Sequence, residues 1–211
     1  MTNQPTIYSS VIFLFMFLGA PAMATEEPVF TSSLKEGAFE LRSYPALVAA
    51  QVSVNGTRDE ASSAGFKLLA GYIFGGNTRR QSMAMTAPVV QSKPGSQTIA
   101  MTAPVLQTAA PDSPDAWTMQ FIMPAGYTLD TLPTPNNAKV QLVALPPARY
   151  AVVTFSGMAH EDDVRQKTAE LTDFMAEHAL RAAGVPALAR YNPPWTLWFM
   201  RRNEVHIPVA P

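Results

Sequence analysis

The chain has 211 residues, of which 47% are hydrophobic, and its formal net charge is −1. This length fits one large domain or two small ones, with enough apolar side chains to form a core. The balanced charge, without a run of Lys or Arg, argues against nucleic acid or an anionic membrane surface as partner. Because the chain has no Cys and its three His lie far apart, disulfides and thiolate chemistry are excluded and a zinc site built on paired His is not expected.

The N-terminus has the pattern of an export signal. Residues 11–20 form an apolar stretch too short to span a bilayer, and Ala22 and Ala24 are small residues before a predicted cleavage point at Thr25. Residues 1–24 contain neither Lys nor Arg, unlike most such signals, so an uncleaved anchor is the alternative. We expect a signal peptide over residues 1–24 and an exported protein, periplasmic in a Gram-negative bacterium, with no membrane span after cleavage.

The first half of the remaining chain predicts two strands followed by a helix. Residues 25–38 are polar and lack periodicity, which indicates a linker. Residues 39–54 predict two strands or one bent strand, broken at Tyr44-Pro45. Thr57 and Glu60 have the spacing of a helix capping box. The apolar residues that follow at helical spacing, before a stop at the glycines 75 and 76, are Ala61, Ala64, Leu68, Leu69 and Tyr72.

A short apolar motif then occurs twice. Residues 84–89 recur without change at 100–105, on either side of a polar segment with Pro94 and Gly95. We interpret residues 83–107 as a local hairpin. Its Met side chains are typical of a core strand, since Met fills irregular gaps, and thioether ligation of a metal is the less favoured alternative for Met83, Met85 and Met101.

The second half of the chain resembles the first. Residues 40–56 correspond without a gap to residues 141–157, pairing for example Pro45 with Pro146. A second helix is predicted from Glu161 to a stop at Gly184, with an apolar stripe formed by Val164, Thr168, Leu171, Met175, Ala179 and Ala182. We therefore predict an α+β fold: two pseudo-repeats of strand–strand–helix–strand–strand, about residues 39–124 and 139–209, forming a twisted antiparallel barrel-like sheet with two helices.

Several motifs in this order resemble the SOUL haem-binding protein family. They are "FELRSYPA", "GFKLLAGYIFGGN", the doubled "MTAPV", "LPTPNNAKV", "VVTFSG", "ARYNPPW" and "RRNEVHIPV". The resemblance implies a single SOUL domain over residues 39–211 that binds haem or another tetrapyrrole in a hydrophobic cleft, without catalysis. Positions proposed in family members as axial ligand or propionate-binding cations are Ser43, Ser63, Gly71 and Thr196 here. Haem is thus the implied cofactor, without strong axial ligation, and a metal ligand is unknown.

A tetrapyrrole is a flat apolar disc with two carboxylates, so its site needs apolar walls and nearby cations. The first helix, the loop after it and a late Trp-bearing loop supply such residues. The predicted cofactor-binding residues are Phe66, Leu69, Ala70, Ile73, Arg79, Arg80, Pro194, Trp195 and Trp198. For the apolar members, ordinary core packing is the alternative.

The remaining charged and titratable residues favour structural roles. Arg201, Arg202 and Glu204 indicate either a propionate clamp or an internal ion pair, and we favour the ion pair. His206 lies between two apolar residues and faces the opposite side of its strand, where we expect it to be packed or exposed. His160 and His178 are expected at the surface.

Three classes of function remain open. The first is a non-catalytic carrier or sequestering protein for haem or a porphyrin-like hydrophobic small molecule, expected as a monomer. The second is binding or hydrolysis of another bulky hydrophobic small molecule, with Glu60, Glu170 or Glu204 as acid or base. The third is an interaction module that uses the second helix or an exposed sheet edge. Since no nucleophile–base pair is visible, we do not expect an enzyme.

Overall fold

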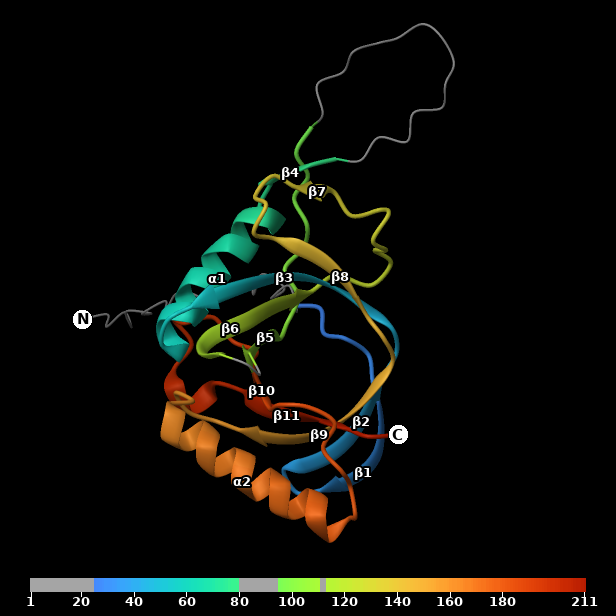
Figure 1. The fold of residues 1–211 in the computed structure, drawn as a ribbon, viewed down its shortest axis with the longest axis vertical. Coiled ribbons are helices and arrows are strands. Elements are labelled where there is room, and N and C mark those ends of the chain that lie inside the picture. Colours follow the sequence, from blue (N-terminus) through green and yellow to red (C-terminus); the bar gives the residue numbers. More distant parts are fainter. Residues whose placement is uncertain (1–24, 80–94, 111–112) are drawn as a thin grey trace, which may run out of the picture.

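The computed structural model describes residues 25–79, 95–110 and 113–211, which form two helices and a large antiparallel sheet (Figure 1). The predicted α+β class is confirmed. The elements, in chain order, are β1 (Thr31–Glu36), β2 (Phe39–Tyr44), β3 (Leu47–Asn55), α1 (Arg58–Ile73), β4 (Asn77–Thr78), β5 (Val105–Ala110), β6 (Ser113–Ile122), β7 (Thr134–Pro135), β8 (Gln141–Leu145), β9 (Ala148–Phe155), α2 (Glu161–Glu177), β10 (Ala187–Arg190), the 3₁₀ helix η1 (Trp198–Met200) and β11 (Asn203–Val209).

Nine of these strands form one sheet in the order β1-β2-β9-β11-β10-β5-β6-β3-β8, while β4 and β7 pair separately. Neighbouring strands are antiparallel. The predicted barrel-like closure is wrong, because β1 and β8 form the two open ends of the order. β1 pairs with the outer edge of β2, which is the edge that closure against β8 would need.

The two halves of the sheet have similar strand orders, and each combines strands from both halves of the chain. From one end, β2, β9, β11 and β10 are neighbours, and from the other end β8, β3, β6 and β5 are neighbours in the corresponding places. Strands β5 and β10 meet in the middle, where Gln107 pairs with Leu188. Each helix covers one half of the sheet, and the two halves meet where β5 pairs with β10.

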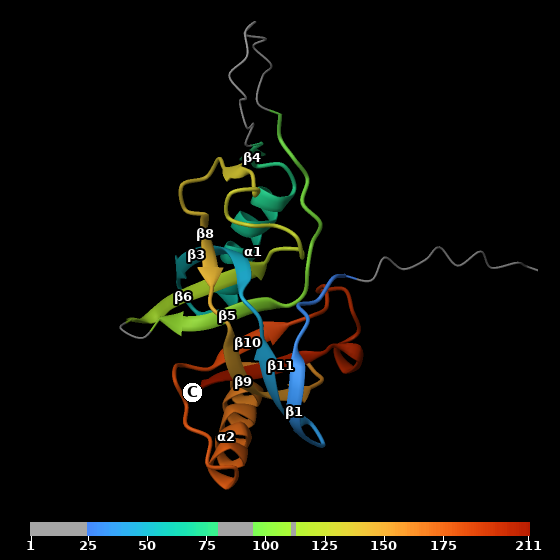
Figure 2. The ribbon, with the colours of Figure 1, turned by 90° about the vertical axis from the view of Figure 1, so that its right-hand side faces the viewer.

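Both helices pack on the same face of the sheet, each over its own hydrophobic cluster. α1 contacts β3 and β6, and α2 contacts β9 and β11. Figure 2 shows α2 toward one end of the molecule and α1 toward the other. The cluster under α1 includes Leu69, Tyr72 and Phe121, and the cluster under α2 includes Leu171 and Val205. A gap between the two helices therefore lies over the central strands.

Helix α1 begins as the sequence predicts. The Thr57 hydroxyl accepts a hydrogen bond from the Glu60 backbone N–H at 3.4 Å, and the Glu60 carboxylate accepts one from the Thr57 N–H at 2.9 Å. This reciprocal capping box satisfies two otherwise unpaired donors. Ala64, predicted in the apolar stripe, is exposed, and Gly65 faces the sheet instead. A Cβ on Gly65 would lie 2.5 Å from Met119 Cγ, so glycine permits the close approach of helix and strand.

Two predicted boundaries are wrong. Helix α2 ends at Glu177 and not near Gly184, because Ala179 has a positive φ of 52° and Ala182 bridges to Val209. Residues 31–36, predicted as part of a linker, form strand β1. Among the described residues, no helix is long and apolar enough to cross a membrane.

The predicted local hairpin is wrong for the second copy of the repeated motif. Residues 105–107 belong to β5, whose two edges are taken by β6 and β10, so no local partner strand can pair there. Met101 is partly buried against the cluster under α1, as expected for a core methionine. The first copy of the motif, with Met83 and Met85, lies outside the described residues.

Candidate functional site

A cavity of about 460 Å³ lies on the helix-bearing face, between the first turn of α1 and one side of α2. Its floor is formed by the central strands β5, β6, β10 and β11. We call it the interhelix groove. Its volume is within the usual range of small-molecule sites, ~300–1,000 Å³. The residues that line it are Arg58, Gln107, Ala109, Trp117, Val164, Arg165, Thr168, Ala169, Thr172, Val185, Pro186, Ala187, Leu188 and Val205.

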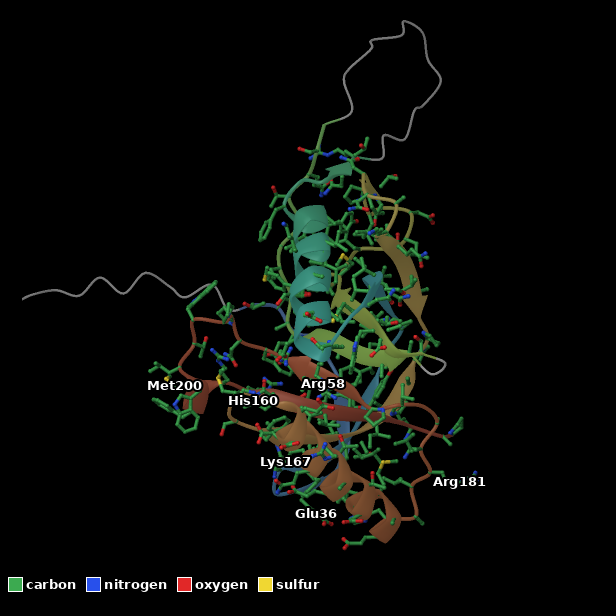
Figure 3. All side chains as sticks on the ribbon, turned by 60° about the vertical axis from the view of Figure 1, so that its left-hand side comes forward. Glu36, Arg58, His160, Lys167, Arg181 and Met200 are labelled. Atoms are coloured by element: carbon green, nitrogen blue, oxygen red, sulfur yellow. The ribbon has the colours of Figure 1, made fainter. Side chains whose placement is uncertain are left out.

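Arg58 is one of the two cations that line this largely apolar groove. It is the first residue of α1, and Figure 3 labels it at the end of α1 that approaches α2. Its guanidinium carbon lies 5.2 Å from the centroid of the Trp117 ring on β6. The Trp117 Nε1–H donates to the Gly56 carbonyl at 3.0 Å, which fixes the ring under the guanidinium. The strand and the helix cap together therefore set the position of Arg58.

Arg58 also has unused hydrogen-bonding capacity. Its Nε and Nη1 atoms are buried and have no hydrogen-bond partner within the described protein. The neighbouring Gln107 donates from Nε2 to the Arg58 carbonyl at 2.7 Å, and the Gln107 Oε1 atom is likewise buried without a partner. Buried polar groups are normally paired, so two donors and one acceptor left over at one place indicate a site for a polar ligand group.

The end of the groove near Arg58 carries further positive charge. Arg190 donates to the Ser62 hydroxyl at 2.8 Å and lies 3.7 Å from Asp59. Burial lowers the pKa of Arg190; Asp59 opposes this shift, while Arg58 and Arg201 lower the pKa further. Arg165, the other cation that lines the groove, is exposed and is paired with Asp162 at 2.5 Å. Of the two lining cations, Arg58 is thus the one without a carboxylate.

The groove has apolar walls and a cation, but its lining offers no side chain that could ligate iron. The residues that line it include no His, Met, Tyr or Cys side chain. Across the described part of the chain, no group of three or more His, Cys, Asp or Glu residues is placed to hold a metal ion. A bound haem would be held by apolar contacts and by Arg58, and it would supply its own redox chemistry.

The α1 residues predicted to bind the cofactor divide into core and surface. Leu69 and Ile73 are 0% and 1% exposed and belong to the cluster under the helix. Phe66 is partly exposed and packs edge-on against Phe121, with ring centroids 5.5 Å apart, and Ala70 is half-buried. Arg79 is exposed and follows the opposite end of the helix from the groove, and Arg80 lies outside the described residues. Leu69 and Ile73 are therefore core residues.

The late loop lies at the surface. Pro194, Trp195 and Trp198 are exposed, and they line neither of the two cavities described here. The Arg190–Ser62 hydrogen bond brings the start of this loop close to the second turn of α1. The start of the loop is thus distant from Arg79, because the helix extends ~1.5 Å per residue between Ser62 and its C-terminal end.

Sequence reasoning missed Arg58, Gln107 and Trp117. One signal was present at Arg58, because the positive end of the helix dipole disfavours a basic residue in the first turn. A cation at this position costs stability unless it has a compensating role. The other two residues carry no such signal, since they meet Arg58 only through the pairing of distant strands.

The opposite face of the sheet carries a second cavity, of about 280 Å³, beside a buried ion network. Glu204 on β11 lies at the centre of this ion network. The Glu204 carboxylate accepts from Arg42 Nη1 at 2.9 Å, from the Tyr191 hydroxyl at 2.6 Å and from Arg202 Nε at 3.1 Å, and it lies 2.8 Å from His206 Nε2. Arg42 Nε also donates to Glu40 at 2.7 Å. The predicted internal ion pair of Arg202 and Glu204 is confirmed.

The network determines the charge state of Glu204. Burial alone would raise the pKa of Glu204, but hydrogen bonds from His206, Tyr191 and Arg42 outweigh it, so its pKa lies below the usual range. Glu204 is therefore ionised at neutral pH, and it links β11 to Arg42 on β2 and to Tyr191 after β10. Arg201 takes no part and donates instead to the carbonyls of Thr196 and Pro194.

The other titratable residues considered from the sequence have local partners. His206 is packed beside Tyr44 and Tyr150, on the opposite face from Val205, as predicted. His160 is exposed at the N-cap of α2, as predicted, whereas His178 is partly buried, with its ring tilted against Phe174 at 4.5 Å between centroids. The carboxylates proposed as acid or base are also engaged: Glu60 caps α1, and Glu170 pairs with Lys167 at 2.7 Å.

Two helices lie on an open antiparallel sheet, and the apolar groove between them contains an arginine whose buried Nε and Nη1 atoms are unpaired within the described residues. This arrangement defines a domain suited to binding a small molecule. Residues 25–97 and 92–208 match the family described as SOUL heme-binding protein. The chain belongs to the SOUL family, and the family predicted from the motifs is confirmed. No curated protein matches the chain.

Solved structures support the fold. A hydrolase from Listeria innocua is 15% identical, with 84% of this chain and 94% of that chain covered and a TM-score of 0.56. The C-terminal domain of EcmrR is 8% identical, with 86% of this chain and 98% of that chain covered and a TM-score of 0.57. At these identities the similarity shows a shared fold and no shared activity.

Proposed function

We propose that this protein binds haem or a related tetrapyrrole, without catalysis, in the interhelix groove. The observation that carries the proposal is Arg58, whose guanidinium lies over Trp117 with two buried N–H groups unpaired. A propionate is a planar carboxylate that such a guanidinium binds well. The apolar floor of the groove, which includes Ala109, Leu188 and Val205, suits the ring.

The lining chemistry leads to a specific expectation about iron. Because the lining residues contribute no axial ligand, the binding free energy comes from the ring and the carboxylates. Haem and iron-free protoporphyrin should then bind with comparable Kd values. The haem spectrum should show a broad and weakly shifted Soret band.

The test is a titration of residues 25–211, which include every described element, with hemin and with protoporphyrin. Arg58→Gln should raise the Kd for both about tenfold or more, because hydrogen bonds to charged groups contribute ~1.5–3 kcal/mol. Arg79→Gln is the matched control, since Arg79 is an exposed cation beyond the other end of α1. It should leave both Kd values unchanged.

The two arginine variants also separate the competing sites. A loss of affinity in Arg79→Gln but not in Arg58→Gln would favour a site beyond the other end of α1. The absence of saturable binding of either tetrapyrrole would exclude the proposal. Protoporphyrin dimethyl ester sharpens the test, because it lacks the carboxylates and should bind wild type and Arg58→Gln equally.

Export would give this binding its role. If residues 1–24 direct the chain out of the cytoplasm, the domain would carry or sequester tetrapyrroles there. The alternative is another bulky hydrophobic small molecule in the same groove. A ligand without carboxylates, such as the ester, would bind wild type and Arg58→Gln with the same Kd. Hydrolysis would need an acid or base in the groove, and the lining residues include neither Asp, Glu nor His.

A further inference from the structure

The late loop exposes an unusual concentration of large apolar side chains. Five of the six residues from 195 to 200 are large and apolar, and their side chains are between 56% and 83% exposed. We call them the apolar tip: Trp195, Leu197, Trp198, Phe199 and Met200. Figure 3 shows Met200 at the end of a loop that projects from the body of the molecule, away from both helices. Soluble proteins scatter exposed apolar residues singly, so a contiguous group of this kind indicates a contact surface.

The backbone of the loop is held in this shape from inside. Arg201 donates to the carbonyls of Thr196 at 2.8 Å and Pro194 at 2.5 Å, and its third nitrogen contacts Met158 Sδ at 3.2 Å. The Trp198 carbonyl accepts from the Gly157 N–H at 3.2 Å. Several polar groups of the loop are thus satisfied without water, which a surface that enters a medium of low polarity requires.

The base of the tip is also where the chain enters the described domain. Glu27, the third described residue, forms an ion pair with Arg202 at 3.1 Å, directly after the loop. The apolar stretch of residues 11–20 precedes this point in the sequence. The N-terminal end of the described chain therefore lies beside the base of the apolar tip.

We propose that the apolar tip docks on the surface of a lipid bilayer by inserting its side chains among the lipids. Trp residues favour the interface between headgroups and acyl chains, and Leu, Phe and Met favour the region below it. The tip itself carries no charge. Arg201 and Arg202 follow the tip directly, but Arg202 is paired with Glu27 and Glu204, and Arg201 is bound to carbonyls of the loop. Docking is therefore driven by apolar insertion and does not depend on anionic lipids.

The experiment measures flotation of residues 25–211 with phosphatidylcholine vesicles, in low and high salt. The expected result is co-flotation that persists in high salt. Leu197→Ser combined with Phe199→Ser should lower the partition coefficient at least tenfold, since each buried CH₂ contributes ~0.8 kcal/mol. Both tip Trp residues remain in this variant and in wild type. In wild type their fluorescence should shift to the blue and be quenched by brominated lipid.

Phe74→Ser is the matched control, because Phe74 is 61% exposed at the other end of α1. It should leave the partition coefficient within about twofold of wild type. Failure to float, equal flotation of the double variant, or binding only to anionic vesicles in low salt would overturn the proposal. Concentration-dependent dimers without lipid that the double variant abolishes would overturn it in favour of self-association. None of these outcomes bears on the tetrapyrrole titration, which tests a different surface.

Discussion

Two arginines, Arg42 and Arg58, both lie beside an aromatic ring, but within the described chain only Arg42 is paired with carboxylates. Arg42 lies on the helix-free face of the sheet, where Glu40 and Glu204 pair with its guanidinium at 2.7 and 2.9 Å. Arg58 lies on the helix-bearing face, where the buried Nε and Nη1 atoms have no partner. Both are adjacent to an aromatic ring, Phe30 at 4.3 Å from Arg42 and Trp117 at 5.2 Å from Arg58.

The difference separates a cation that holds the fold from a cation available to a ligand. A buried charge whose partners are built into the protein is costly to remove, because the partner is left uncompensated. A cation with unpaired donors already carries its desolvation penalty, and a carboxylate ligand would relieve it. The two residues should therefore respond in opposite ways to substitution.

The largest expected effect follows the loss of Arg42. Arg42→Met should lower the free energy of unfolding by about 3–5 kcal/mol, because Glu204 keeps its burial and loses one of its cations. The measurement is urea unfolding at neutral pH. A loss under about 1 kcal/mol would mean that Arg202 alone compensates Glu204, and the comparison with Arg58 would fail.

Acid should weaken the same network. The pKa of Glu204 is lowered in the folded state, so its contribution to stability is present above its ordinary value of 4.5. It is lost as the pH falls through the folded pKa, at up to about 1.4 kcal/mol per pH unit for one proton. Unfolding free energies measured at several pH values below 5 should fall steeply in wild type.

Glu204→Gln is the control for this pH dependence. Part of the acid slope should persist in the variant, because the pKa values of Glu40, Glu60 and Glu170 are also lowered. If the slope below pH 5 were identical in the two proteins, Glu204 would not be the titrating group, and the network would be weaker than its distances indicate.

Tyr191→Phe should have an intermediate effect. Burial and the nearby Glu204 raise the pKa of Tyr191, so its hydroxyl stays protonated and donates to the carboxylate at 2.6 Å. The variant keeps the ring under Arg202, where the guanidinium lies 3.7 Å from the centroid. Its free energy of unfolding should fall by about 1.5–3 kcal/mol, the usual value for a hydrogen bond to a charged group. No change in urea unfolding would show that Arg42 and Arg202 suffice.

The sequence predicted those parts of the fold that depend on local chemistry. The capping box at Thr57 and the strand break after Tyr44 are confirmed, because both arise within a few residues. Strand β1 was missed because only Leu34 of its six residues is even partly buried, so the strand lacks the alternation that reveals a half-buried strand. The end of α2 was missed because the bridge from Ala182 to Val209 overrides the helical propensity of an Ala-rich segment.

The candidate site was less accessible to sequence reasoning, because it depends on contacts between distant residues. Aromatic content alone made Trp195 and Trp198 candidates for a ligand wall, but a sequence does not say whether an aromatic loop faces a cavity or solvent. Arg58 and Trp117 are brought together by the pairing of β3 with β6, which ends at Asn55 and Ala116. That register follows from the whole sheet and from no local pattern.

The smallest expected effect on stability, and the sharpest test of the comparison, is at Arg58. Arg58→Met removes two unpaired buried donors, whose burial costs ~1–3 kcal/mol, and a cation at the positive end of a helix dipole. The lost contact with Trp117 offsets ~0.5–1 kcal/mol of this gain. Urea unfolding should therefore show no loss of stability and a gain of up to about 1 kcal/mol, although protoporphyrin affinity falls as in Arg58→Gln. A destabilisation like that of Arg42→Met would make Arg58 a structural cation, and the groove would then lack the feature that suits it to a carboxylate.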